Sequence, residues 1–208
     1  MLTSTLKPGL MISLQIIRSK KMKKLVLLSA ILTLVFAGCE SSQKKINAEK
    51  NPDLVSAAEK GDKDQTKKAL DEGADPNAKN TKGWSSLMIT AYYGNDEVAS
   101  ELIGANADVN QKNTNGVTPL MIASYKGNVK LVNQLIAKGA DVNAQSSKKV
   151  TALMAAAYTG KKETVSVLIA AKADLNIKTQ SGATALYYAE KKNNTEVAEI
   201  LKAAGAEK

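Results

Sequence analysis

The sequence predicts an all-α fold made of stacked repeats, about five units of 33 residues each. Two observations lead to this fold class. The residues from 51 onward repeat at a constant interval of 33, and the chain is 44% hydrophobic but only 4% aromatic, with abundant alanine. Small side chains suit close helix packing, and a fixed period of about 20–50 residues is typical of repeat proteins. One such unit cannot bury its own apolar face, so neighbouring units must stack to form the core.

Three registers define the repeat, each spaced by 33 residues. The first holds Gly61, Gly94, Gly127 and Gly160, with Asn193 in the next place. The second holds Asp75, Asp108, Asp141 and Asp174, each preceded by alanine and followed two residues later by asparagine. The third holds Gly83, Gly116 and Gly182, with Lys149 as its exception. So many coincidences at one interval exclude chance.

A period of 33 with these motifs resembles the ankyrin repeat, whose unit is a β-turn followed by two antiparallel helices. The third unit matches best, in Gly116-Val117-Thr118-Pro119-Leu120-Met121-Ile122-Ala123 and again in Leu135-Ile136-Ala137-Lys138-Gly139-Ala140-Asp141-Val142-Asn143. The resemblance covers residues 51–208 and implies an ankyrin-repeat solenoid with short β-turn hairpins. Its units fall at about 51–82, 83–115, 116–148, 149–181 and 182–208.

The helix ends have a physical reason in each unit. A hydroxyl side chain that can cap the first helix recurs at Ser85, Thr118, Thr151 and Thr184, and Pro119 suits a first helical turn. The first register fits the left-handed residue that ends this helix, a conformation that glycine and then asparagine tolerate best. Leu102, Leu135, Leu168 and Leu201 mark the buried face of the second helix.

The end units are expected to cap the stack, and one framework position departs from the family pattern. The end units should be more polar, as residues 65–68, Glu199 and Lys202 indicate. The histidine that the family places after Pro-Leu is replaced by Met88, Met121, Met154 and Tyr187. Flexible methionine side chains are expected to fill the space of that histidine, with some loss of rigidity.

The first 38 residues have the layout of a secretory signal peptide. Basic residues 20–24 precede an apolar run at 25–37, which is shorter than the roughly 20 residues of a membrane-spanning helix. A transmembrane anchor is therefore the weaker interpretation. If Met22 is the true start, residues 1–21 are an over-extension of the reading frame.

The segment Val35-Phe36-Ala37-Gly38-Cys39 resembles a bacterial lipobox, although Phe36 stands where the family usually has leucine. The resemblance implies a covalent lipid on Cys39, with an ordinary signal peptide as the alternative. Glu40 favours the outer membrane, facing the periplasm or the cell surface. Residues 39–50 are then the lipidated cysteine and a flexible tether, because they carry little apolar surface.

Composition argues against several functions. The chain has a net charge of +9, but residues 1–38 supply six of those charges, and +3 is too little to indicate a nucleic-acid partner. With no histidine and one cysteine, we expect no metal site, no cofactor beyond the lipid and no catalytic residues. The acidic residues of the repeats fall at turns, so we predict neither an enzyme nor a small-molecule substrate.

The resemblance implies a surface that binds another protein, presented by the hairpins and the first helices. Three columns of variable positions map onto this surface: Trp84, Val117, Val150 and Ala183; then Tyr92, Tyr125, Tyr158 and Lys191; then Tyr93, Lys126, Thr159 and Lys192. From these columns the candidate binding residues are Trp84, Tyr92, Tyr93, Tyr125, Lys126, Tyr158, Thr159, Lys191 and Lys192.

These residues leave alternatives open. The tyrosines either form a ladder of contact residues or pack between repeats as framework, and the lysines either select an acidic partner or are simply solvated. We expect a membrane-anchored module for protein–protein interaction in the bacterial cell envelope. The alternative is an inhibitor or immunity-type protein that blocks an envelope-targeted enzyme or toxin.

Overall fold

The structure is a computed structural model and describes residues 47–207. Five antiparallel pairs of α-helices make up this part of the chain. This confirms the predicted all-α repeat fold. The predicted signal peptide, Cys39 and the first part of the tether lie outside the described residues.

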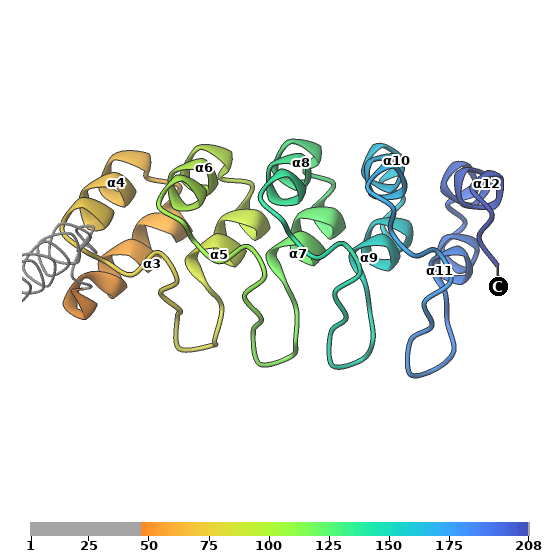
Figure 1. Cartoon of the computed structure of the whole chain (residues 1–208), viewed down its shortest axis with the longest axis horizontal. Coiled ribbons are helices and arrows are strands. Elements are labelled where there is room, and N and C mark those ends of the chain that lie inside the picture. Colours follow the sequence, from red (N-terminus) through yellow and green to blue (C-terminus); the bar gives the residue numbers. More distant parts are fainter. Residues whose placement is uncertain (1–46, 208) are drawn as a thin grey trace, which may run out of the picture. The chain divides into compact units, whose positions relative to one another are not determined.

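Each pair consists of an inner and an outer helix. The inner helices are α3 (Asn51–Lys60), α5 (Ser86–Tyr93), α7 (Pro119–Lys126), α9 (Ala152–Tyr158) and α11 (Ala185–Lys191). The outer helices are α4 (Lys63–Asp71), α6 (Asp96–Gly104), α8 (Val129–Ala137), α10 (Lys162–Ala170) and α12 (Thr195–Ala203). Figure 1 shows two rows of helices, with long loops extending beyond the row of inner helices. Each helix contacts its own partner and the equivalent helix of the next pair.

The helix ends agree with the prediction. The hydroxyl oxygen of Thr118 accepts a hydrogen bond from the backbone N–H of Met121 at 3.4 Å, and Ser85, Thr151 and Thr184 make the equivalent bond. The four glycines of the first register have φ between +69° and +80°, and Asn193, at the next position of that register, has φ +58°. Such caps typically contribute about 1 kcal/mol each to helix stability.

The core runs continuously through the stack between the two rows of helices. The predicted leucine register is fully buried, and Met88, Met121 and Met154 are buried at the position of the family's histidine. Burying one such side chain contributes about 1.5–3 kcal/mol. In the last unit, Tyr187 takes the place of the methionine and is exposed.

One residue of the polar segment 65–68 is not exposed. The side chain of Thr66 is fully buried. Its hydroxyl donates to the carbonyl oxygen of Asp62 at 2.7 Å, so the hydroxyl needs no contact with water. The other three residues of that segment are exposed, as expected of an end unit.

Asparagine side chains join each unit to the next. Asn77 accepts a hydrogen bond from the backbone N–H of Asp108 at 2.7 Å, and the same bond recurs from Asn110 to Asp141 and from Asn143 to Asp174. Within the first unit, Asn51 accepts from the backbone N–H of Asp75. The series ends at Asn176, which accepts from the backbone N–H of Glu207. These bonds fix the spacing of successive units and therefore of the loops that they carry.

The last residues of the predicted tether belong to the folded part. Residues 48–50 form a short 3₁₀ helix, η1 (Ala48–Lys50), and the backbone N–H of Asn47 donates to the carbonyl oxygen of Gly73 at 2.6 Å. The Lys50 ammonium lies 2.9 Å from the Glu72 carboxylate. A backbone bond and an ion pair thus hold a segment whose own apolar content is too low to order it.

Candidate functional site

Four loops, each between the outer helix of one pair and the inner helix of the next, end in a hairpin. Each hairpin closes with a backbone bond, as from the N–H of Asn113 to the carbonyl of Val117 at 3.1 Å. Inside it, the Asn113 side chain accepts from the N–H groups of Asn115 and Val117. Asn80, Ser146 and Thr179 hold the equivalent positions, so a short polar side chain shapes every turn.

Neighbouring hairpins are also joined to one another. The backbone N–H of Ser147 donates to the carbonyl oxygen of Asn115 at 2.9 Å. One unit further on, the Gln180 side chain donates to the carbonyl of Ser147 at 2.8 Å. The hairpins before α7, α9 and α11 are therefore held in a fixed relation, which gives the surface beside them a defined shape.

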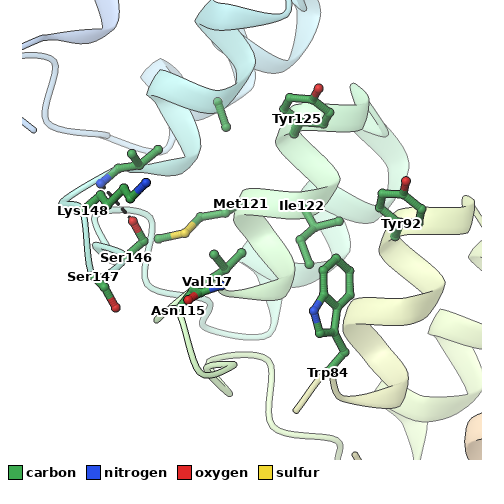
Figure 2. Close-up of a pocket in the computed structure, with 12 residues that line it drawn as sticks. Trp84, Tyr92, Asn115, Val117, Met121, Ile122, Tyr125, Ser146, Ser147 and Lys148 are labelled. Atoms are coloured by element: carbon green, nitrogen blue, oxygen red, sulfur yellow. Dashed lines mark hydrogen bonds between the residues drawn. The ribbon is translucent and has the colours of Figure 1, made fainter. Parts of the chain in front are cut away.

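A hollow of about 480 Å³ opens on this surface across the second, third and fourth units. Its apolar wall comes from α7 and the hairpin side chains, including Met121, Ile122 and Val117. In Figure 2, Met121 extends from α7 toward residues 146–148 of the next hairpin, while Trp84 stands on the opposite side, near Ile122. The remaining lining residues are Tyr92, Tyr125, Asn115, Ser146, Ser147, Lys148, Val150 and Ala155.

The hollow depends on one small residue. Ile89, Ile122, Ala155 and Tyr188 occupy the same position of successive inner helices. Ala155 lacks most of the side-chain volume of its neighbours and lines the hollow, whereas Ile122 is buried beside it. This column was not predicted from the sequence. The repeat registers consist of positions that keep the same residue type, whereas the side chain at this position changes in size from unit to unit.

At one end of the hollow, three of the candidate residues, Trp84, Tyr92 and Tyr93, form an aromatic group, here called the Trp84 group. The Trp84 and Tyr92 rings lie 5.7 Å apart and edge to face, and the Tyr92 and Tyr93 rings lie 5.3 Å apart in the same manner. The ammonium of Lys126, from the next unit, lies 4.4 Å from the centre of the Tyr92 ring. Edge-to-face and cation–π contacts of this kind contribute about 0.5–1 kcal/mol each at an exposed site, so they hold these rings in place.

The three tyrosines of the predicted ladder remain on the surface. The exposed fractions of Tyr92, Tyr125 and Tyr158 are 44%, 48% and 39%, and that of Tyr93 is 60%. Figure 2 shows Tyr92 and Tyr125 on neighbouring helices with their hydroxyl groups directed the same way. Each tyrosine therefore keeps both a packed side and an accessible side.

A second aromatic group, not identified from the sequence, surrounds Tyr158. The rings of Tyr158 and Tyr188 lie 5.9 Å apart, and those of Tyr187 and Tyr188 lie 5.8 Å apart. The ammonium of Lys192 lies 4.4 Å from the Tyr158 ring and that of Lys191 lies 5.4 Å from the Tyr187 ring. The adjacent pair Tyr187-Tyr188 in α11 was the signal that could have found it.

Thr159 differs from the other candidate residues. Its hydroxyl lies 3.0 Å from the carbonyl oxygen of Tyr125 and 3.0 Å from that of Ala155. It is half-buried, and its hydrogen-bonding capacity is used within the stack. Thr159 thus helps to join two units.

The carboxylates of the repeats take part in structure. The Asp108 side chain accepts from the N–H of Asn110 at 2.8 Å, and the same turn recurs at Asp75, Asp141 and Asp174. Hydrogen bonding to Lys50 lowers the pKa of Glu72, and hydrogen bonding to Glu196 raises the pKa of Lys162. None of these groups lines the hollow. Within residues 47–207 no group of side chains is placed to hold a metal ion, and no helix is long and apolar enough to cross a bilayer.

Comparison with known families agrees with this architecture. A family model described as ankyrin repeats in three copies matches residues 54–146 and again 129–208, which together cover more than half of the chain. A search of curated proteins finds none that matches.

Proposed function

The chain belongs to the ankyrin-repeat family, and we propose that the hollow and the Trp84 group beside it form its binding site for another protein. Ankyrin repeats in general mediate protein–protein interaction, and proteins built from them are typically binding modules rather than enzymes. The observation that carries the proposal is the hollow of about 480 Å³ between exposed aromatic side chains. Large aromatic residues around an apolar depression are the usual composition of an interface hot spot.

The rigidity of the surface supports this role. The hairpins beside the hollow are closed by backbone bonds, linked to their neighbours and spaced by the asparagine series. A surface that is already ordered before binding loses little conformational entropy when a partner docks. The Trp84 and Tyr92 rings are likewise held by edge-to-face contact before any partner arrives.

We further propose that the protein is a lipoprotein of the bacterial cell envelope, anchored through Cys39. The support lies in the sequence: a basic stretch, an apolar run and a lipobox-like segment ending at the single cysteine of the chain. Only a short chain segment separates Cys39 from residue 47, where the folded unit begins. An anchored module of this kind holds its partner close to the membrane.

Binding is tested by capture from a membrane extract of the source cells. The full chain is immobilised beside a Trp84→Ala, Tyr92→Ala, Tyr125→Ala variant and a control with Tyr187→Ala and Lys202→Ala, which lie outside the hollow. Circular dichroism first establishes that all three are folded. We expect a protein retained by the wild type and by the control but lost by the triple variant. Equal retention by all three would place the interface elsewhere.

The anchor is tested separately by metabolic labelling with a palmitate analogue. The wild type should incorporate the label and sediment with membranes, whereas Cys39→Ser should do neither. Label in the Cys39→Ser protein, or an unlabelled wild type, would contradict the lipoprotein proposal.

A further inference from the structure

The hairpins and inner helices of the last four units carry charge of almost one sign. Residues 78–93, 111–126, 144–159 and 177–192, here called the inner face, contain nine lysines and one carboxylate, a net charge of +8. All nine lysines are exposed, and the single carboxylate, Glu190, pairs with Lys202 at 2.8 Å. The nine lysines are Lys79, Lys82, Lys112, Lys126, Lys148, Lys149, Lys178, Lys191 and Lys192.

The rest of these units is charged in the opposite sense. Residues 94–110, 127–143, 160–176 and 193–207, which contain the outer helices, hold ten acidic residues and six lysines, a net charge of −4. The net charge of residues 78–207, +4, thus hides a division between two sides of the repeat stack. A positive field confined to one side attracts anionic groups to that side in particular.

The apolar hollow lies within this positive region. Lys148 is one of its lining residues, and Lys126 stands over Tyr92, another lining residue. Lys149 follows directly in the same hairpin. A ligand that fills the hollow with an apolar group therefore meets ammonium groups at its edges.

We propose that the partner docks through an acidic peptide segment, in which an aliphatic or aromatic residue enters the hollow and flanking Asp or Glu residues face Lys126, Lys148 and Lys149. This inference rests on the proposed function and names the chemistry of its partner. The apolar residue supplies most of the affinity, and the carboxylates raise the association rate and the specificity.

The same side chains disfavour a nucleic acid. Binding of single strands depends on bases that stack on aromatic faces, but Lys126 covers the Tyr92 ring and Lys192 covers the Tyr158 ring, each at 4.4 Å. Residues 47–207 contain no arginine, the residue best suited to bidentate recognition of phosphate. Two of the inner-face lysines already donate to backbone carbonyls, Lys79 to Lys112 and Lys112 to Gln145. An apolar hollow framed by lysines is matched by an acidic peptide with one large apolar residue.

Selection of ligands from a random library tests this chemistry directly. A display library of random dodecapeptides is panned on the full chain, purified in detergent, at low ionic strength, and the enriched peptides are sequenced. We expect enrichment of peptides that combine several Asp or Glu residues with a single aliphatic or aromatic residue. Affinities of three such peptides are then measured by fluorescence anisotropy at two salt concentrations, with a weaker affinity expected at the higher one.

Two pairs of variants separate charge from shape. One triple variant, Lys126→Glu, Lys148→Glu, Lys149→Glu, should lower the affinity for the peptides at least about tenfold at low salt. The matched triple variant on the outer side, Lys67→Glu, Lys130→Glu, Lys138→Glu, should change this affinity by less than about twofold. Ala155→Ile, which adds the side chain found at Ile122, should fill the hollow and weaken binding without changing charge. Its control is Ala137→Ile, at the exposed end of α8.

Several results would overturn the inference. They are enriched peptides without an acidic excess, equal effects of the two lysine triples, unchanged affinity in Ala155→Ile, or no enrichment at all. Tighter binding of a single-stranded 20-mer oligonucleotide or of anionic phospholipid vesicles than of the peptides would assign the inner face to those ligands instead. If the partner captured from membrane extract is lost by the aromatic triple variant but kept by the lysine triple, only this inference fails. If the aromatic triple retains it, the proposed function itself fails.

Discussion

The side-chain oxygen of Asn110 accepts a hydrogen bond from the backbone N–H of Asp141 at 2.7 Å, although the two residues belong to different repeats. The amide of Asn110 also donates to the carbonyl of Gly139 at 3.0 Å. A single side chain thus satisfies two backbone groups of the following turn. The recurrence of the first bond along the stack makes it the main polar link between units.

Replacing Asn110 by alanine should therefore destabilise the stack. Two hydrogen bonds are lost, so the free energy of unfolding should fall by about 1–3 kcal/mol in urea denaturation. Asn133→Ala, on the exposed side of α8, is the control and should change stability by less than about 0.5 kcal/mol. Equal stability of the two variants would mean that Asn110 does not link the units.

Gly116 should tolerate alanine less well than Gly182. Both have a positive φ, +72° and +79°, so a Cβ costs about 1–2 kcal/mol at either position. At Gly116 the added atom would also lie 2.9 Å from the backbone nitrogen of Ser147, whereas at Gly182 it meets nothing within 4 Å. Gly116→Ala should thus lower the thermal midpoint more than Gly182→Ala. It should also disturb the hollow, which Ser147 lines, and a smaller loss at Gly116 would contradict the described hairpin contact.

Replacing Lys149 by glycine should stabilise the fold. It has φ +59° in the register where the other units have glycine. Removing the Cβ relieves the left-handed conformation, and after the added entropy of the unfolded chain we expect a gain of about 0.5–1 kcal/mol. Lys148→Gly, which removes the neighbouring lysine outside the left-handed region, should lower stability instead. A comparison of denaturation midpoints tests the pair, and a loss in Lys149→Gly would be the contrary result.

The contact between η1 and α4 should depend on pH in a defined direction. The hydrogen bond from Lys50 lowers the pKa of Glu72, and the same bond raises the pKa of Lys50. A lowered carboxyl pKa stabilises the fold above the usual range of glutamate, and this contribution is lost as the pH falls through the folded-state value. A raised lysine pKa gives stability that is lost only in strongly alkaline solution.

Thermal unfolding of Glu72→Gln should therefore differ from the wild type near neutral pH and converge with it in acid. The expected difference is small, because the two side chains are 36% and 37% exposed and solvent screens their ion pair. Glu59→Gln, exposed on α3, provides the control. A difference that persists unchanged in acid would assign the effect to something other than this ion pair.

Local signals account for what the sequence predicted well. A hydroxyl at Thr118, a proline at 119 and a left-handed glycine at 127 each act within a few residues, so their effects could be derived without a structure. The sequence left open whether Tyr92 and Tyr125 lie on the surface or pack between repeats, and the structure shows both partly exposed. The repeat period then carried each local conclusion to the other units.

The hollow could not be derived in this manner. It arises because Ala155 is smaller than Ile122 and because residues 146–148 approach α7 from the next hairpin, and both are relations between units. The division of charge was not predicted either, because the net charge of the chain does not show whether a lysine lies on the inner or the outer side of a helix pair.

The bond from Asn47 to the carbonyl of Gly73 has a mechanical consequence. A force that pulls on the N-terminal segment reaches the first helix pair before any other, because η1 is bonded to the loop after α4. In a stack where each unit contacts only its neighbours, tension should peel units away in order from that end. The first pair should then unfold under tension while the surface around Trp84 and Ile122, one and two units further on, stays folded.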